Sequence, residues 1–436
     1  MDFEQAHEYL LSLGNEVAAM KLGLENIGKL LKALDEPQNT YLKLQVAGTN
    51  GKGSVCAFLN AICVSASVRV GMFTSPHLIT ITERVQIDGV PISEDDFAKY
   101  AMNVKSAAED LVAKGELESI PTFFEQITGI ALLAFADARV ELAILETGLG
   151  GRLDATTAAN AEIAVITRID HDHQEYLGDT LEQIAAEKGA IIRPESAVVV
   201  GEQPSDAMKV ILDRSSAFGI RPRLADLVGT SRRDEALKLI TWRDEYAIEN
   251  LGLLGRHQIE NAKIAVLVAE MLGERLPINR GDIITGLESA RHPGRLEFQS
   301  RYLFDGAHNP SGAKALRAFL EENIERPIIM IFGAMRDKEV TNIARLLFPL
   351  AQHLILTESR NSRSMKAAEI IAKSSGSLSV NVHQTRTVED ALLLAERLSP
   401  PESIILVTGS LYLIGEAKSL LEERRTHLKF GVSNLR

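Results

Sequence analysis

The sequence contains very little cysteine. Only Cys56 and Cys63 occur among its 436 residues. They lie seven positions apart in one expected helix, and no cluster of histidines or further cysteines accompanies them. A disulfide or zinc framework is therefore not expected, and this composition fits a reducing compartment.

Long apolar runs and an excess of positive charge are also absent. No run reaches the roughly 18 apolar residues of a membrane span, and the opening "MDFEQAHEYL" lacks the basic and apolar regions of a signal peptide. We therefore expect a cytoplasmic protein that makes no membrane contact. The net charge of −12 argues against a nucleic-acid partner, because phosphate backbones attract a basic face. An anionic small substrate remains open, since a local site can be basic within an acidic whole.

The sequence does contain short β-branched apolar runs that alternate with helical patterns. The first series comprises "KLQVAGTN", "VRVGMFTSPH", "VELAILETG", "AEIAVITRIDHDH" and "AVVVGE". Such continuously apolar strands are typical of a parallel sheet that is covered on both faces. The segment "TERVQIDGVPIS" instead alternates around Asp88-Gly89, which favours a β-ribbon.

A second series of strands begins after residue 300. It comprises "RYLFDGAHN", "PIIMIFGAM", "HLILTES", "NVHQTR" and "SIILVTGS". A helical stretch follows each run, so we predict a second, smaller α/β domain. Pro293 and Gly294 punctuate the segment 290–298. We place the boundary there and expect domains at residues 1–295 and 296–436.

Polar residues follow several of these predicted strands. They are Gly51-Lys52, Ser75-Pro76-His77, Glu146, Asp172-His173 and Asp305. In open α/β sheets, ligands bind outside the carboxyl ends of the strands. This coincidence predicts a ligand site at that edge of the sheet.

The stretch "VAGTNGKGSV", residues 46–55, is similar to a phosphate-binding loop but departs from the formula G-x-x-x-x-G-K-[ST]. Aligned on Gly51-Lys52, it has Gly53 where the hydroxyl residue is usual and Ser54 one position later. Backbone N–H groups, the positive end of the following helix and the lysine charge would still attract phosphate. The alternative is a tight turn between strand and helix, which would not require a lysine.

Acidic residues beside this loop indicate a magnesium site. Glu146 ends one strand, and Mg²⁺ takes one or two protein ligands while substrate phosphates and waters supply the rest. The run Asp170-His171-Asp172-His173 follows another strand. Histidine is more usual for zinc, but no cysteine set or second histidine pair is present, so we interpret the run as part of a Mg-nucleotide site. The alternatives are a solvated acid and an exposed polar loop.

Three further segments are ambiguous from spacing alone. Lys188 lies on an expected helix, where most lysines are simply solvated. His257 and Asn261 are four positions apart on one helical face, which could bind a planar base or lie exposed. In "FDGAHNPSGAKAL", the proline near a helix start favours strand, loop and helix over a hairpin. Asp305 and His308 would then face the ligand.

Together, nine segments resemble the folylpolyglutamate synthase family, which includes bacterial bifunctional enzymes with dihydrofolate synthase activity. The segments are "GTNGKGS", "FTSPHL", "TERV", "ETGLGGRLDAT", "DHQEYLGDTLEQIAAEKGAI", "GRHQIENA", "HPGRLE", "FDGAHNP" and "FGAMRDKE". They follow the order of the family, and the resemblance covers nearly all of the chain. These enzymes are ATP-dependent amide ligases that are related to the Mur ligases.

The resemblance implies a large P-loop ATPase domain with a mostly parallel sheet and a smaller C-terminal, Rossmann-like α/β domain. It implies that a carboxylate attacks the γ-phosphate of ATP to give an acyl phosphate, which the amino group of L-glutamate then attacks. The implied substrates are ATP, L-glutamate and a folate or dihydropteroate, with Mg²⁺ as the metal. We expect the protein to be a monomer.

The resemblance also assigns roles to residues that match the family motifs. The implied ATP-binding residues are Gly51, Lys52, Gly53, Ser54, Asn261, Arg295 and Asp305. The implied metal ligands are Ser75, Glu146 and His173. The implied catalytic residues are Lys52, Lys188 and His308, with Lys188 carried as a carbamate. The implied folate- or pteroate-binding residues are Thr122, Phe123, Phe124, Glu125, Leu153, Asp154 and Ala155.

The sequence departs from the family pattern at Thr157, where an asparagine is usual. This departure concerns the fine folate contacts and not the ATP site. Asp154 resembles an acid that the family needs for dihydropteroate binding, and this resemblance favours the bifunctional enzyme over one that only extends polyglutamate chains. A Mur-type ligase for another acyl substrate is the nearest alternative, but those enzymes carry a substrate domain before the phosphate loop, and the residues preceding this loop are too few for one. A P-loop ATP-binding protein without ligase activity is a further alternative, which would not need the second domain.

Overall fold

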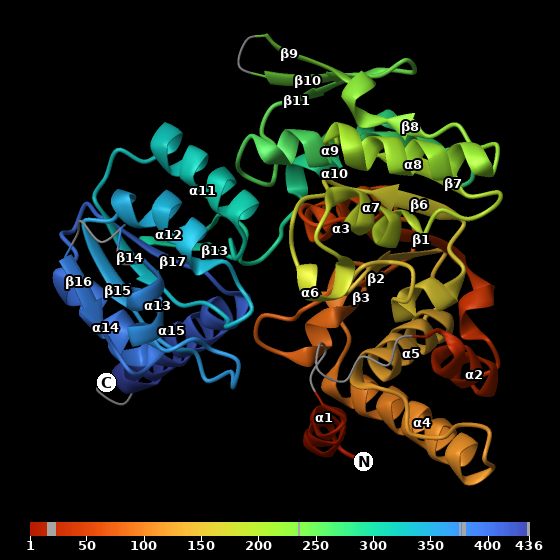
Figure 1. Ribbon diagram of the computed structural model, residues 1–436, viewed down its shortest axis with the longest axis horizontal. Coiled ribbons are helices and arrows are strands. Elements are labelled where there is room, and N and C mark those ends of the chain that lie inside the picture. Colours follow the sequence, from red (N-terminus) through yellow and green to blue (C-terminus); the bar gives the residue numbers. More distant parts are fainter. Residues whose placement is uncertain (15–22, 234–235, 375, 377–380, 434–436) are drawn as a thin grey trace. The chain divides into compact units, whose positions relative to one another are not determined.

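The computed structural model describes residues 1–14, 23–233, 236–374, 376 and 381–433, with the side chains of 233 and 425–433 excepted. The chain divides into two compact units (Figure 1). Unit 1 contains residues 1–77, 81–252 and 258–291, and unit 2 contains residues 78–80, 253–257 and 292–436. The predicted boundary after residue 295 lies a few residues beyond the observed change of unit at 291–292.

Unit 1 is built on an eight-stranded sheet in the order β4-β3-β2-β5-β1-β6-β7-β8. The strands are β1 (Leu42–Ala47), β2 (Val70–Phe73), β3 (Val85–Ile87), β4 (Val90–Pro91), β5 (Leu142–Glu146), β6 (Ile163–Ile166), β7 (Ala197–Val200) and β8 (Arg223–Leu224). All neighbours from β2 to β8 run parallel. At the edge, β3 and β4 form the antiparallel ribbon that the alternation around Asp88-Gly89 predicts. The predicted, mostly parallel sheet is confirmed.

Helices cover both faces of this sheet. On one face, α4 (Glu94–Ala113) and α5 (Phe123–Asp137) share a core with Ala143 and Leu145 of β5. On the other face, α3 (Lys52–Ser65) contacts β1, β2 and β5 (Figure 1). Because successive side chains of a strand point to opposite faces, a strand that is buried throughout, such as β5, supplies both cores.

The remaining helices of unit 1 are α1 (Phe3–Ser12), α2 (Glu25–Ala33), α6 (Gln174–Leu177), α7 (Leu181–Gly189), α8 (Ser205–Ala217), α9 (His257–Leu272) and α10 (Arg280–Ser289). No helix in the described parts of the chain is both long enough and apolar enough to cross a membrane.

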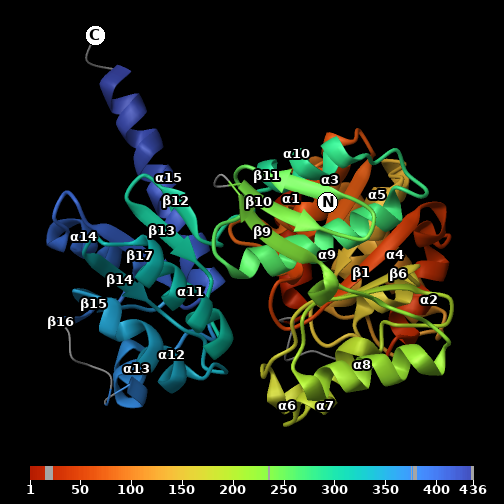
Figure 2. The same cartoon turned by 90° about the horizontal axis from the view of Figure 1, so that it is seen from above.

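A three-stranded antiparallel sheet in unit 1 is absent from the sequence-based expectations. It comprises β9 (Gly229–Arg233), β10 (Ala236–Ile240) and β11 (Glu245–Ile248), in the order β11-β10-β9. Its buried side chains alternate with more exposed ones along β10 and β11. β11 packs against α10, and the sheet forms a separate layer in Figure 1. In Figure 2, which looks from above, the sheet lies in front of other elements of unit 1.

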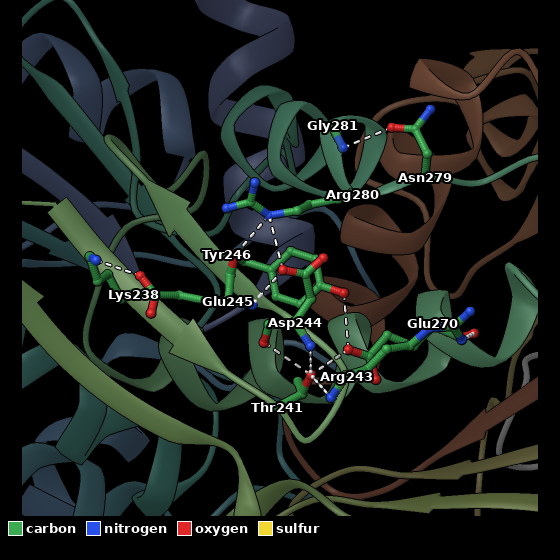
Figure 3. A network of polar contacts seen from close by, with 10 residues as sticks. All are labelled: Lys238, Thr241, Arg243, Asp244, Glu245, Tyr246, Glu270, Asn279, Arg280 and Gly281. Atoms are coloured by element: carbon green, nitrogen blue, oxygen red, sulfur yellow. Dashed lines mark hydrogen bonds and ion pairs between the residues drawn. The ribbon is translucent and has the colours of Figure 1, made fainter.

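A buried carboxylate fastens this sheet to α9 (Figure 3). Oε1 of Glu270 accepts hydrogen bonds from the hydroxyls of Thr241 at 2.5 Å and Tyr246 at 2.9 Å. Nη1 of Arg243 donates to the backbone oxygen of Glu270 at 2.9 Å. The turn between β10 and β11 is therefore held at the carboxyl end of α9.

Unit 2 is a second α/β sheet, in the order β12-β13-β17-β14-β15-β16. Its strands are β12 (Glu297–Gln299), β13 (Tyr302–Asp305), β14 (Ile328–Phe332), β15 (His353–Leu356), β16 (Asn381–Gln384) and β17 (Ile404–Thr408). Its helices are α11 (Pro310–Asn323), α12 (Val340–Leu347), α13 (Ala367–Ser374), α14 (Val388–Leu398) and α15 (Leu411–Ser433). Only β12 is antiparallel. Two apolar cores, one with α11 to α13 and one with α14 and α15, confirm the predicted smaller α/β domain.

One close helix contact in unit 1 bears on the site. α10 packs along α3, the helix that follows the predicted phosphate loop, more extensively than any other pair of elements among the described residues. The contact centres on Gly286, where an added Cβ would lie 2.4 Å from Cα of Ile62 and 2.5 Å from its backbone nitrogen. The backbone of α3 cannot yield as a flexible side chain could, so this position has no room for a methyl group.

We predict that Gly286→Ala destabilises the protein. Alanine should gain about 1 kcal/mol of helix propensity, but overpacking against the α3 backbone should cost about 1–3 kcal/mol. Thermal unfolding followed by circular dichroism checks this prediction. Gly28→Ala in α2 is the matched control, because a Cβ there meets nothing within 4 Å. The control should keep or raise the melting temperature, and an equal response of both variants would contradict the steric argument.

Candidate active site

The loop between β1 and α3 has the form of a phosphate cradle. Gly51, directly before α3, has a φ of +91°, a left-handed conformation that other residues rarely adopt. A Cβ at Gly51 would lie 2.4 Å from Oδ1 of Asn261, and one at Gly48 would lie 1.9 Å from Oγ1 of Thr167. Gly51 is therefore required by its backbone conformation, and Gly48 by the lack of space beside Thr167.

The side chain of Lys52 folds back over this loop. Its Nζ donates to the backbone oxygens of Gly48 at 3.1 Å and Thr49 at 3.5 Å. The ammonium thus adds a full positive charge near the amino end of α3, where the helix dipole already favours an anion. This combination suits the phosphates of a nucleotide.

The loop is fixed to the segment that follows β6. The backbone nitrogen of Thr49 donates to the oxygen of Arg168 at 2.9 Å, and its hydroxyl donates to the oxygen of Asp170 at 2.9 Å. Gln203 holds the same segment from the other side, accepting from the nitrogen of Ile169 at 2.8 Å. The D-H-D-H run is thereby placed beside the phosphate loop, as its position after a strand predicts.

Helix α9 covers the loop with two amides. Nε2 of Gln258 donates to the hydroxyl of Ser54 at 3.1 Å, and Nδ2 of Asn261 donates to Oε1 of Gln258 at 2.8 Å. Ser54, Gln258 and Asn261 are all buried. The hydroxyl of Ser54, one position later than in the usual phosphate-loop formula, therefore has a protein partner, and Asn261 lies against Gly51.

Glu146 and Ser75 come together at the carboxyl ends of β5 and β2. Glu146 is 6% exposed, and its Oε2 accepts from the backbone nitrogen of Ser75 at 3.4 Å. A cis peptide bond joins Ser75 to Pro76. Because β5 lies directly beside β1 and pairs Glu146 with Val46, the carboxylate belongs to the same edge of the sheet as Lys52.

His173 lies in the loop after β6 in an uncommon backbone conformation. Its φ is +52°, and such outliers in non-glycine residues concentrate at functional sites. Its backbone nitrogen donates to Oδ1 of Asp172 at 3.0 Å, and its Nε2 lies 3.8 Å from the same oxygen. Asp172 therefore lies beside the histidine that the family resemblance assigns to a metal.

The donors at this edge fit a metal that is shared with a substrate. Among the described residues, no group of three or more histidine, cysteine, aspartate or glutamate side chains could enclose a metal ion. A hydroxyl, a carboxylate and an imidazole from Ser75, Glu146 and His173 make an incomplete, oxygen-rich set. Such a set suits Mg²⁺, which keeps waters and substrate phosphates in its coordination shell.

Lys188 lies near the carboxyl end of α7. It is buried, unlike most lysines on such a helix, which are solvated. It is 4% exposed, and no group among the described residues hydrogen-bonds or ion-pairs with its Nζ. Burial, and then the charge of Lys52, lower the pKa of Lys188 to about 7, against the opposing effect of Asp172 and Asp154. A large fraction of this amine is therefore neutral at pH 7.

Other buried lysines differ from Lys188 in having a carboxylate partner. Lys43 lies 3.1 Å from Glu162, Lys263 lies 2.9 Å from Glu260, and Lys418 lies 2.6 Å from Glu297. Buried charges in proteins are normally paired in this way. Burial alone therefore does not account for the absence of a carboxylate partner at Lys188 among the described residues. This absence distinguishes Lys188 from the other buried lysines.

The segment 122–125 begins α5. Thr122 and Glu125 form a capping box, with Oε2 of Glu125 accepting from the nitrogen of Thr122 at 2.8 Å. Phe123 belongs to the apolar core, and Phe124 is partly exposed, with its ring 5.8 Å from the ring of Phe73. A Cβ at Gly148 would lie 2.5 Å from Cζ of Phe124. The two segments that the resemblance assigns to the folate, 122–125 and the loop that contains 153–155, are therefore neighbours.

A buried arginine adjoins this region. Arg84 is 2% exposed, its guanidinium lies 5.2 Å from the ring centroid of Phe123, and its Nε donates to Nδ1 of His77 at 2.8 Å. Burial and the Arg84 charge lower the pKa of His77 to about 3, so the imidazole is neutral at pH 7. A neutral imidazole can accept this hydrogen bond, whereas a charged one cannot.

Asp154 organises its own loop. Its Oδ2 accepts from the backbone nitrogens of Gly148 at 2.9 Å and Leu149 at 3.0 Å, and its Oδ1 accepts from the nitrogen of Thr156 at 3.0 Å. The carboxylate is 3% exposed, and burial raises its pKa despite these donors. Leu153 and Ala155 flank it in the same loop.

Thr157, which replaces the usual asparagine, has a structural role here. Its hydroxyl donates to the oxygen of Gly151 at 2.7 Å and accepts from Nε2 of Gln45 at 2.7 Å. Thr157 is 7% exposed. The threonine therefore forms a hydrogen bond across the loop that Asp154 organises.

In unit 2, Arg295, Asp305 and His308 lie around one turn. Asp305 is buried, and its two oxygens accept from the nitrogens of Leu296 and Ala307, each at 3.0 Å. Nη1 of Arg295 donates to the oxygen of Gly306 at 3.2 Å, and Nδ1 of His308 lies 2.8 Å from that oxygen. Burial raises the pKa of Asp305, and Arg295 opposes this effect.

Comparison with known proteins agrees with this geometry. The Mur ligase middle domain matches residues 46–269, and the Mur ligase, glutamate ligase domain matches residues 294–411. The dihydrofolate synthase/folylpolyglutamate synthase of Bacillus subtilis is 32% identical over 418 residues, which cover 92% of this chain and 96% of that protein. The chain belongs to the dihydrofolate synthase/folylpolyglutamate synthase family.

Further relatives extend the match to solved structures. The dihydrofolate synthetase of Saccharomyces cerevisiae is 30% identical, with 94% of this chain and 100% of that protein covered. The folylpolyglutamate synthase of Mycobacterium tuberculosis in complex with ADP matches with a TM-score of 0.88 at 29% identity, covering 96% of this chain and 98% of that one. The family, the ligase class and the two-domain α/β fold that the nine motifs predict are confirmed.

Three residues that support the site were not predicted from the sequence. Gln258 binds Ser54, Gln203 holds the segment after β6, and Arg84 binds His77. Gln258 could have been found, because it lies one helical turn before Asn261 in "GRHQIENA". Arg84 stands in the quoted motif "TERV", but no sequence pattern distinguishes a buried arginine from a solvated one. Gln203 carries no local signal.

Proposed function

We propose that this chain joins L-glutamate to folates, and also to 7,8-dihydropteroate, at the cost of ATP. The observation that carries the proposal is the set of groups at the carboxyl ends of β1, β2, β5 and β6, where the phosphate loop meets Glu146, Ser75 and the loop of His173. Solved relatives support the substrates. An Escherichia coli enzyme was solved with DHPP and ADP, and a bifunctional synthase was solved with Mn, AMPPNP and L-glutamate.

The reaction proceeds in two steps. A carboxylate oxygen of the folate or dihydropteroate attacks the γ-phosphorus of ATP, so that an acyl phosphate forms and ADP leaves. The neutral amino group of glutamate then attacks the acyl carbon, phosphate leaves, and the nitrogen loses a proton as the amide forms. Lys52 and the amino end of α3 hold the phosphates in place and stabilise the charge that moves between them.

Ser75, Glu146 and His173 would hold the magnesium ion. Bound there, the ion would supply positive charge that neutralises part of the charge of the substrate phosphates. Asp172 accepts a hydrogen bond from the backbone nitrogen of His173, and Glu146 accepts one from the backbone nitrogen of Ser75. In unit 2, Arg295 and Asp305 would contact the nucleotide, and His308 would help to place glutamate or the reacting carboxylate.

Lys188 would carry a carbamate. The neutral amine adds to the carbon of CO₂, and one proton is released as the carbamate anion forms. The supporting features are the burial of Lys188, its missing carboxylate partner and a pKa lowered to about 7. A carbamate would turn this lysine into an oxygen donor beside Lys52.

Segments 122–125 and 153–155 would bind the folate or dihydropteroate, and the conformation of the loop that contains 153–155 would contribute to this binding. Phe124, which is partly exposed, offers a ring for stacking on a flat pterin. Asp154 holds three backbone nitrogens of the neighbouring loop, so its influence on dihydropteroate would pass through the shape of that loop. Thr122, Phe123 and Glu125 would set the position of Phe124 by capping and packing the start of α5.

We predict that Lys52→Ala and Glu146→Ala each lower the ligation rate at least about 10²–10³-fold, because each removes a group that stabilises transferred charge. ADP release is measured with dihydropteroate and with tetrahydrofolate in parallel, each with and without glutamate. Lys32→Ala and Glu118→Ala, at exposed positions, are the controls and should retain full activity. ADP release that needs neither glutamate nor a folate would overturn the ligase proposal.

We predict that Asp154→Ala lowers glutamylation of dihydropteroate more than extension of folates. The reason is that the loop held by Asp154 would contact the smaller substrate. The two rates are compared in one enzyme preparation, with the melting temperature as a measure of folding. Thr157→Val disturbs the same loop and keeps the carboxylate, so it separates loop shape from charge. Equal losses with both substrates in the Asp154 variant would refute this role.

We predict that ¹³C-labelled bicarbonate gives a carbamate signal in nuclear magnetic resonance spectra and that Lys188→Arg removes it. Lys263→Arg, at a buried lysine that is paired with Glu260, should leave the signal in place. Because only the neutral amine adds CO₂, the signal should fall as the pH drops below the lowered pKa of about 7. A signal that survives in Lys188→Arg, or none in the unmodified protein, would rule out the modification.

A further inference from the structure

A polar cavity lies in unit 1, at the opposite edge of the large sheet from the phosphate loop. Its volume is about 650 Å³, which is within the usual range for small-ligand sites. Its wall includes Ile163, Ala197 and Arg223, the first residues of β6, β7 and β8. Those strands are parallel neighbours (Figure 1), so their amino ends share one edge. None of the groups proposed for the ligation reaction lines this cavity.

The cavity is rich in arginine. Four arginines line it, and we call it the arginine pocket: Arg193, Arg221, Arg223 and Arg275. Arginine presents a planar fork of donors that matches carboxylate and phosphate groups. Four guanidinium groups around one cavity are unexpected in a chain with a net charge of −12, because acidic residues are in excess over the chain as a whole.

Carboxylates in the wall do not neutralise this charge. Glu162 is engaged by Lys43 at 3.1 Å, from outside the pocket. Glu274 lies 3.2 Å from Arg223 and 3.8 Å from Arg243. The remaining carboxylate of the wall, Glu195, forms no ion pair among the described residues. Positive charge therefore exceeds negative charge in the pocket.

Two of the arginines have no partner for their side chains in the described structure. Arg221 and Arg275 are exposed, and neither side chain forms a hydrogen bond or ion pair with another described residue. A third, Arg223, donates through Nη2 to Glu274, while its Nη1 is buried without a hydrogen-bond partner in the described structure. A buried donor of this kind is usually satisfied by water or by a ligand.

The fourth arginine makes the wall rigid. Arg193 donates from its two terminal nitrogens to Oδ1 of Asn160 and to the backbone oxygen of Ala161. It joins the loop before β7 to the loop before β6. On the other side, the network around Glu270 holds the end of α9, next to the lining residues Met271 and Leu272 (Figure 3). Hydrogen bonds therefore hold the pocket on two sides, at Arg193 and at the end of α9.

We propose that the arginine pocket binds a small, multiply charged anion that carries carboxylate or phosphate groups. Arg221, Arg223 and Arg275 supply the binding guanidinium groups, and Arg193 supplies the wall. The site is separate from the phosphate loop, and its occupation does not depend on the ligation reaction. The volume of the pocket is large enough for a metabolite of several carbon atoms and not only for a single inorganic ion.

The one tryptophan of the chain provides the probe. The guanidinium of Arg223 lies 6.0 Å from the ring centroid of Trp242, whose side chain is exposed. Fluorescence of Trp242 is followed during titration with citrate, for carboxylates, and with inorganic pyrophosphate, for phosphates, against sodium chloride at equal ionic strength. We expect a saturable change with at least one of the two anions and none with chloride. The anion that saturates at the lower concentration identifies the chemical class.

The decisive variant is Arg221→Ala/Arg275→Ala. Both side chains are exposed and unpartnered, so folding should be unchanged, and affinity should fall about tenfold or more. Lys114→Ala/Lys209→Ala removes the same charge at exposed positions outside the pocket and should bind as the unmodified protein does. No saturable change with either anion, or equal weakening in both double variants, would overturn the proposal. So would a pyrophosphate response that Lys52→Ala abolishes and the arginine variant retains, since it would belong to the phosphate loop.

Discussion

The shared direction of four neighbouring strands determines where the phosphate loop, Ser75, Glu146 and the loop of His173 lie. β2, β5, β1 and β6 run parallel, so the residues that follow them meet at one edge. The strand order reverses at β1, whose next strands in the sheet are β5 on one side and β6 on the other. Loops on the two sides of such a strand diverge, which opens a crevice for a ligand. The phosphate loop follows this strand.

Hydrogen bonds from neighbouring elements then fix the conformation of the phosphate loop. The loop after β1 is held from one side by the segment after β6, through Thr49, and from another side by α9, through Gln258 and Ser54. α3 in turn depends on its contact with α10, where Gly286 allows the two backbones to approach. A change far from the loop, at the α3–α10 contact, can therefore move Lys52. The rigidity of the loop comes from these neighbours, because its own glycines give it none.

Sequence patterns predicted the parts of the fold that depend on local composition. Continuous apolar runs predicted most of the parallel strands, because both faces of such strands are buried whatever their neighbours are. β16, in "NVHQTR", is an exception with partly exposed side chains. The sheet of β9 to β11 was missed, although "ALKLITWRDEYAI" alternates. Tertiary contacts could not be predicted, for another reason. Whether Arg84 or Lys188 is buried depends on elements far away in the chain, so the spacing of residues within a helix or loop does not indicate the burial of either side chain. Only the family resemblance singled out Lys188.

The charge balance around Lys188 gives a physical reason for a modified side chain. As an ammonium, it is disfavoured by burial and by Lys52, while Asp172 and Asp154 favour it, and the first two effects prevail. A carbamate reverses each electrostatic sign: Lys52 would attract it, and the two aspartates would repel it. Asp154 is already engaged by backbone nitrogens, which draw charge away from its oxygens. Asp154 would therefore repel the carbamate less than its formal charge suggests, and the attraction between the carbamate and Lys52 would have less repulsion to overcome. A negative group at Lys188 would also hold the ammonium of Lys52 at the loop, where the phosphates of ATP need it.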